Sequence, residues 1–247
     1  MIAANAGRSG RYRSRAPEQI RNFRGCFLRK DVEKLSQIYH DHDGRTDLEV
    51  LGWPNAQDIP RRYEALLSPL DFSAYSRQRP LRLLDFGSGL GFLLDWLAAN
   101  DLLDRVDYTG VDLSAPILAE VRKRWPDQRF DFRDIRDEPF PAEAFDFAII
   151  CGIFTVKHEN SYEETRALAQ GALEAIWPSV KIGLAFNSMS KHVDWERDDL
   201  FHWPLDDIMA FCKQKLGRHV SFKLDYGLWE VATEMDPVVN RRAIFTP

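Results

Sequence analysis

The stretch Asp85-Phe86-Gly87-Ser88-Gly89-Leu90-Gly91 places an acid two residues before the first of three closely spaced glycines. Glycines at this spacing let a backbone turn tightly and approach a ligand closely. The triplet Asp85-Phe86-Gly87 matches the metal-holding triplet of protein kinases, but no HRD-type catalytic loop precedes it and no lysine-bearing strand of the required kind lies upstream. The kinase interpretation is therefore rejected, and a ligand-binding loop remains.

A dinucleotide-binding turn is the nearer alternative, since a strand, a glycine loop and a helix are its setting. Its pattern G-x-G-x-x-G requires a glycine where Phe92 stands; the third glycine here is Gly91. A pyrophosphate binds at such a helix N-terminus because the backbone there is partially positive, and Asp85 would put a negative charge beside it. A ligand that carries a cation matches this loop better.

S-adenosylmethionine is such a ligand, with an ammonium and a sulfonium group. The stretch from Asp85 to Gly91 resembles motif I of the class I S-adenosylmethionine-dependent methyltransferases. Further acids follow in the order that this family has them. The resemblance implies that Asp112 holds the ribose hydroxyls, beside Leu113, and that Asp134 accepts from the adenine amino group while Ile135 covers the ring. It further implies cofactor contacts from the residues of the loop and of the fourth strand end: Asp85, Gly87, Ser88, Gly89, Gly91 and Cys151.

Strand and helix patterns alternate from Leu81 onward, which is typical of a parallel sheet with crossover helices. The patterns predict strands at 81–86, 106–111, 129–134, 145–154 and 181–186. They predict four helices. The first spans 92–99, the second begins at Ser114, the third begins at the capping box of Ser161 and Glu164, and the fourth runs from Pro204 to Gly217.

The C-terminal part changes to two-residue periodicity, with Val220, Phe222 and Leu224 alternating with polar residues. Tyr226-Gly227 then turns the chain into 228–235, which predicts an antiparallel hairpin. The predicted fold is α/β: a Rossmann-like, seven-stranded, mostly parallel sheet with a C-terminal antiparallel hairpin and an N-terminal helical cap. The predicted division is a mobile basic tail at 1–30, a cap or lid at 31–80 and the methyltransferase core at 81–247.

The segment before the first strand is rich in aromatic residues and arginine. It is similar to the leading segment of bacterial small-molecule methyltransferases that act on sugars or natural products, where a cap closes over cofactor and acceptor. This resemblance implies cofactor contacts from Tyr39 and Arg62. It implies an acceptor site formed by Trp53 with Phe154 and Tyr162. Ordinary packing of Trp53 and Tyr63 against the core is the alternative.

A hydroxyl acceptor must also lose a proton, and two histidines stand where a base could act. His158 follows the fourth predicted strand and His192 follows the fifth, in loops that face the acceptor in such folds. Histidine titrates near neutral pH and can serve as a general base. Asp194 and Tyr162 are weaker candidates.

Composition excludes several classes of function. A net charge of −5 argues against a general nucleic-acid binder, and the N/D-P-P-Y sequence of amino-directed enzymes of this fold is missing after the fourth strand. Cys26, Cys151 and Cys212 fit neither a disulfide framework nor a zinc site, which favours a reducing, cytoplasmic location. The longest apolar run is too short to span a bilayer. The cluster His40-Asp41-His42-Asp43 is interpreted as a solvated loop, with no metal expected.

The first 30 residues hold eight Lys or Arg residues against one acid, Glu18. Such a tail could hold an anionic partner, but a solvated tail is the simpler interpretation. Together these observations predict S-adenosylmethionine-dependent methyl transfer to a small hydroxylated molecule, such as a sugar or secondary metabolite, with O- favoured over N-methylation. A dinucleotide-binding oxidoreductase and a non-catalytic S-adenosylmethionine-binding protein are the alternatives, and the oligomeric state is left open.

Overall fold

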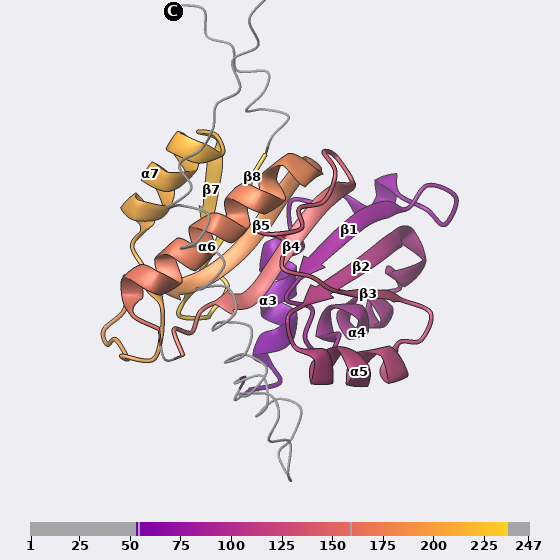
Figure 1. Ribbon diagram of the computed structural model, residues 1–247, viewed down its shortest axis with the longest axis horizontal. Coiled ribbons are helices and arrows are strands. Elements are labelled where there is room, and N and C mark those ends of the chain that lie inside the picture. The colour runs from indigo at the N-terminus through magenta and orange to yellow at the C-terminus, as the bar shows by residue number, and fades with distance from the viewer. Residues whose placement is uncertain (1–52, 54, 159, 237–247) are drawn as a thin grey trace, which may run out of the picture.

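A computed structural model describes residues 53, 55–158 and 160–236 of the 247-residue chain. One twisted sheet crosses the molecule with strand order β3-β2-β1-β4-β5-β8-β7, and β6 pairs with β5 off this path (Figure 1). The strands are β1 (Leu81–Phe86), β2 (Val106–Asp112), β3 (Arg129–Phe132), β4 (Phe145–Phe154), β5 (Val180–Ser190), β6 (His202–Trp203), β7 (Val220–Lys223) and β8 (Glu230–Met235). All pairs are parallel except β5 with β8 and β7 with β8. This confirms the predicted fold class, to which the structure adds the two-residue strand β6.

Helices cover both faces of the sheet and give the molecule three layers (Figure 1). On one face lie α3 (Asp58–Leu67), α4 (Phe92–Ala99) and α5 (Ala115–Arg124), which share one apolar cluster. On the other face lie α6 (Tyr162–Ile176) and α7 (Leu205–Lys215), which share the second cluster with β4, β5 and β8. Three short 3-10 helices lie in connections: η1 (Phe72–Ala74), η2 (Leu103–Arg105) and η3 (Trp177–Ser179).

Local signals fix the helix starts that border the site. Ser161 and Glu164 form the predicted capping box: the Ser161 side chain accepts from the Glu164 backbone N–H, and the Glu164 carboxylate accepts from the Ser161 N–H. The Ser114 hydroxyl accepts from the Ile117 N–H at the start of α5. The helix predicted at 92–99 has the same bounds in the structure.

Two strands end elsewhere than predicted. The strand expected to run to Asp134 stops at Phe132, where its pairing with β2 ends at Asp112. Among the described strands β3 lies at the edge of the sheet, so none of them pairs with its other side to prolong it. The strand expected to stop at Phe186 continues to Ser190, because β8 and β6 both pair with its far end. Partners distant in sequence set these two boundaries.

The described part of the predicted cap includes α3 and η1, and α3 packs on the sheet. Tyr63, Leu66 and Leu67 are buried in the same cluster as α4 and β1. Tyr39, His40-Asp41-His42-Asp43 and the basic tail at 1–30 lie outside the described residues. Within the described part of the chain, no helix has the length and apolar character needed to cross a membrane.

Candidate functional site

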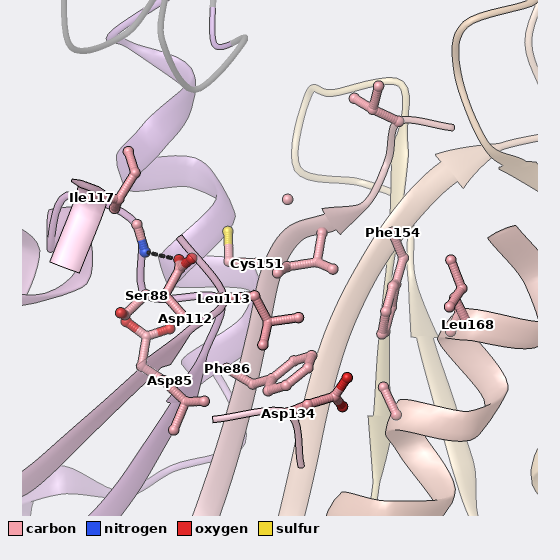
Figure 2. Close-up of a pocket in the computed structure, with 18 of the residues that line it drawn as sticks. Asp85, Phe86, Ser88, Asp112, Leu113, Ile117, Asp134, Cys151, Phe154 and Leu168 are labelled. Atoms are coloured by element: carbon pink, nitrogen blue, oxygen red, sulfur yellow. Dashed lines mark hydrogen bonds between the residues drawn. The ribbon is translucent and has the colours of Figure 1, made fainter. Parts of the chain in front are cut away.

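A cavity of about 460 Å³ opens where the carboxyl ends of β1, β2 and β4 meet. Its walls come from the glycine loop after β1, the turns after β2 and β3, the end of β4 and one side of α6. Figure 2 shows side chains of these elements converging on the cavity, with Asp85, Ser88 and Asp112 on one side and Phe154 and Leu168 on the other. The sequence-predicted residues that line it are Trp53, Asp85, Gly87, Ser88, Gly89, Asp112, Leu113, Asp134, Cys151, Phe154 and His158.

The glycine loop is held against β2 by backbone hydrogen bonds. The N–H groups of Gly87 and Ser88 both donate to the Val111 carbonyl, at 2.7 and 3.0 Å. Gly87 has φ +79°, and a Cβ there would lie 1.8 Å from Ile153 Cδ1. A side chain at this position would be strained by the positive φ, and Ile153 would have to move to make room for it. Gly91 does not line the cavity; a Cβ there would meet Val121 of α5.

The two acids of the loop region have different surroundings. Asp85 is 3% exposed and accepts a 2.7 Å hydrogen bond from the Tyr108 hydroxyl. Burial raises the pKa of Asp85 to about 7; the Tyr108 hydrogen bond lowers it and nearby Asp112 raises it. Asp112 accepts from the backbone N–H groups of Gly89 at 3.0 Å and Ser114 at 2.9 Å, the former drawn in Figure 2. Burial raises the pKa of Asp112 as well.

Asp134 lines the cavity, but its carboxylate already has a partner. Arg136, two residues on, donates to both oxygens, from Nε at 2.9 Å and from Nη2 at 2.7 Å. Ile135 is fully buried in the cluster on the α6 face and is not a wall residue. The expected contacts of Asp134 and Ile135 with adenine stay predictions.

Side chains of three different segments contact the end of β4. Gly152 has φ +84°; its N–H donates to Asn187 Oδ1 at 2.8 Å, and its carbonyl accepts from the Thr155 hydroxyl at 2.6 Å. The Trp53 ring lies over Gly152, with Cζ2 3.0 Å from where a Cβ would stand. Burial raises the pKa of the adjacent Cys151 thiol well above its usual value, so this group stays protonated and is no nucleophile.

Arg62 forms an ion pair instead of lining the cavity. Its guanidinium donates to both carboxylate oxygens of Glu230, from Nη2 at 2.6 Å and from Nε at 2.9 and 3.1 Å, and its carbon lies 5.0 Å from the Trp53 ring centroid. Its role as a cofactor ligand stays a prediction. Tyr39 lies outside the described residues.

The structure separates the two candidate bases. His158 lines the cavity, from the loop after β4. His192 is exposed after β5 and is not a wall residue; its backbone N–H donates to the Ser190 hydroxyl. Tyr162 also lies off the cavity, with its ring packed against Phe201, and Asp194 is exposed away from the wall. No group of three His, Cys, Asp or Glu side chains suited to a metal ion occurs among residues 53, 55–158 and 160–236.

Several wall residues were not singled out from the sequence. Arg133 and Arg136 flank Asp134, and the Asp-x-Arg spacing was a local signal for the Asp134–Arg136 pair. Ile153 covers Gly87. Because it directly follows Cys151-Gly152 at the predicted strand end, it could have been expected to line the cavity. Asn160 and Leu168 reach the cavity from the loop before α6 and from α6 itself.

Comparisons with known proteins agree with this geometry. Residues 83–174 match a family described as a methyltransferase domain. Rv1506c of Mycobacterium tuberculosis, a protein named as a methyltransferase, is 29% identical over 153 residues, which are 61% of this chain and 90% of the relative.

Solved structures share the fold at low sequence identity. One is the 1,6-didemethyltoxoflavin-N1-methyltransferase of Burkholderia thailandensis with S-adenosylhomocysteine (TM-score 0.55, 17% identity, 90% of this chain and 92% of that one). Another is the magnesium protoporphyrin IX methyltransferase of Synechocystis PCC 6803 with S-adenosylhomocysteine (TM-score 0.52, 13% identity, 88% and 99%).

Proposed function

We propose that this protein, which is a class I S-adenosylmethionine-dependent methyltransferase, transfers the methyl group to a hydroxyl of a small molecule such as a sugar or secondary metabolite. The observation that carries the proposal is the cavity of about 460 Å³, which has apolar walls and a few polar groups, His158 among them. Small-molecule sites have this size and this mixture of walls. A polymeric acceptor would need an open, charged groove instead.

The residues of the cavity fit the cofactor. Gly87 keeps the loop free of side chains, and Asp85 and Asp112 offer carboxylates to the ammonium and the ribose hydroxyls. S-adenosylmethionine supplies an electrophilic methyl group when bound. The protein contributes alignment of donor and acceptor, which can be worth ~7–11 kcal/mol, and walls that exclude water.

His158 is the proposed general base for the acceptor hydroxyl. It lines the cavity from the loop between β4 and α6, whereas His192 is not a wall residue. Removing the hydroxyl proton at His158 Nε2 or Nδ1 as the new bond forms would accelerate transfer by ~10²–10⁴-fold.

Binding without turnover is the competing function, and it would be favoured if bulky side chains filled the acceptor space. Trp195 is not a wall residue; it packs against Trp229, with ring centroids 6.4 Å apart. The Phe154 ring lies edge-on against Phe186 at 5.8 Å and forms part of the wall. Neither position argues for a filled acceptor space, which supports an enzyme over binding without turnover. The dinucleotide alternative has no comparable support, since the family match and the named relative are both methyltransferases.

The test is a screen with methyl-labelled S-adenosylmethionine against small hydroxylated, amine and carboxylate compounds. Label is expected on hydroxylated compounds, with turnover reduced ~10²-fold or more in His158→Gln and nearly unchanged in His192→Gln. Label on amines alone would contradict the proposed acceptor class. Full activity of His158→Gln with a loss in His192→Gln would reassign the base.

A further inference from the structure

A buried relay of hydrogen bonds runs from α3 through β8 and β5 to the end of β4. Arg62 donates to Glu230 at 2.6 Å, Asn187 Nδ2 donates to the other Glu230 oxygen at 2.6 Å, and Asn187 Oδ1 accepts from the Gly152 N–H at 2.8 Å. Arg62 and Glu230 are 168 positions apart in the chain. None of the three side chains belongs to the wall of the cavity.

If these hydrogen bonds served only to stabilise the fold, the free energy of desolvating their buried polar groups would be poorly compensated. The Arg62 and Glu230 side chains are only 11% and 5% exposed, and Asn187 is 1% exposed. Desolvation of a buried ion pair offsets most of its attraction, so well-packed apolar residues would stabilise the fold as well or better. Arg62 Nη1 is buried and makes no hydrogen bond with any described residue.

Both ends of the relay meet in the wall of the cavity. At one end, Asn187 holds the Gly152 peptide in its left-handed conformation. At the other, the Arg62 guanidinium lies over the Trp53 ring, which itself stacks on Phe92 at 5.8 Å and covers Gly152. The residue after Gly152 is Ile153, whose side chain lies on Gly87. A turn of the Gly152 peptide would therefore move Ile153 relative to the glycine loop.

We propose that Asn187, Glu230 and Arg62 are positioning residues that hold the Gly152 peptide and the Trp53 ring together, and thereby set the spacing between the end of β4 and the glycine loop. The inference rests on the cofactor part of the proposed function and is independent of the acceptor. The relay acts on the cofactor through Gly152, Ile153 and Trp53.

Reversing the polarity of one hydrogen bond tests the relay. In Asn187→Asp two carboxylates face each other, and in Glu230→Gln the Arg62 charge loses its counter-ion. In the double variant, the carboxylate introduced at position 187 accepts from the Gly152 N–H and from the side-chain amide N–H introduced at position 230. The amide oxygen at position 230 accepts from Arg62. Each single variant is expected to bind S-adenosylhomocysteine ~10-fold or more weakly, and the double variant within ~3-fold of the wild type.

Asp146→Asn is the matched control. Asp146 forms a two-point ion pair with Arg82, with Nη2 to Oδ1 at 2.7 Å and Nε to Oδ2 at 3.2 Å, and neither residue lines the cavity. The Asp146→Asn substitution should lower the midpoint of thermal unfolding and leave the affinity for S-adenosylhomocysteine within ~2-fold of the wild type. In the wild type, exchange of the Gly152 amide proton should be slow by NMR, a measurement that requires no variant.

The inference would be overturned by single variants that bind like the wild type, by a double variant that binds no better than the singles, or by Asp146→Asn weakening binding equally. Fast exchange of the wild-type Gly152 amide would do so too. A wild-type protein that binds no S-adenosylhomocysteine would instead overturn the cofactor part of the proposed function, and this inference with it.

Discussion

The affinity for the cofactor is expected to rise steeply with pH because of Asp85. This carboxyl is buried beside Tyr108, and its burial raises its pKa to about 7. An ammonium or sulfonium binds the ionised carboxylate and not the neutral acid. Below pH 7 the site must therefore lose a proton before the cationic ligand gains its counter-ion.

The size of the effect follows from the fraction of ionised Asp85. A group with a pKa of about 7 is ~3% ionised at pH 5.5 and ~75% ionised at pH 7.5. Affinity should therefore increase ~25-fold across this range, or ~2 kcal/mol.

The stability of the unliganded protein should change in the opposite direction. The folded-state pKa of Asp85 lies above the ordinary value of 3.8, so between about pH 4 and 7 the folded protein holds a proton that the unfolded chain has lost. The contribution of protonated Asp85 to the free energy of unfolding is fully present below about pH 4. It falls by up to ~4 kcal/mol as pH rises to 7.

Calorimetric titration with S-adenosylhomocysteine, which keeps the ammonium, measures this linkage. Titrations at pH 5.5, 6.5 and 7.5 in buffers of different ionisation enthalpy should give release of nearly one proton at pH 5.5. In Asp85→Asn most of the pH dependence should disappear. An affinity that changes less than ~3-fold between pH 5.5 and 7.5 would refute the reasoning, as would Asp85→Asn retaining the full change.

Two further predictions concern the walls of the cavity. Asp112→Ala should weaken binding of S-adenosylhomocysteine by ~10–100-fold, because a charged acceptor for two hydroxyls is lost. The control Asp131→Ala, on β3 and paired with Arg129 away from the cavity, should bind normally; equal losses in both would contradict the role of Asp112. Trp53→Ala should lower turnover of a small acceptor by ~10-fold or more, whereas deletion of residues 1–19 should leave it nearly unchanged. The reverse result would exclude a small acceptor held by Trp53.

Local signals in the sequence predicted most of the sheet and one side of the cavity. The strand at 81–86 and the helix at 92–99 have the predicted bounds, because both are coded by short runs of apolar residues around the glycine loop. Asp112 was expected at the cofactor from the family resemblance, and the structure places it beside this loop because neighbouring parallel strands end at the same sheet edge. Periodicity and turn chemistry are sufficient for such features.

The other side of the cavity depends on contacts between residues that are distant in sequence, which local sequence patterns do not predict. Glu230 is an ordinary acid in the predicted hairpin, and Arg62 was expected to contact the cofactor; their ion pair exists only once α3 packs against β8. Gly152 was noted as a strand end, but its left-handed conformation follows from Asn187 on the next strand. Such contacts become visible only when the whole sheet is assembled.

Strand β8 has a consequence for how the chain folds as it is synthesised. It is the last strand of the described chain to be made, yet it lies inside the sheet, between β5 and β7. Until β8 leaves the ribosome, β5 lacks its β8 partner strand and Arg62 lacks its partner Glu230. Nucleation can occur earlier on β1, β2 and β4, but the sheet closes only through contacts of long sequence separation, which form slowly. The glycine loop is thus made early, while β8, whose Glu230 pairs with Arg62 and with Asn187, is made after all the other described strands.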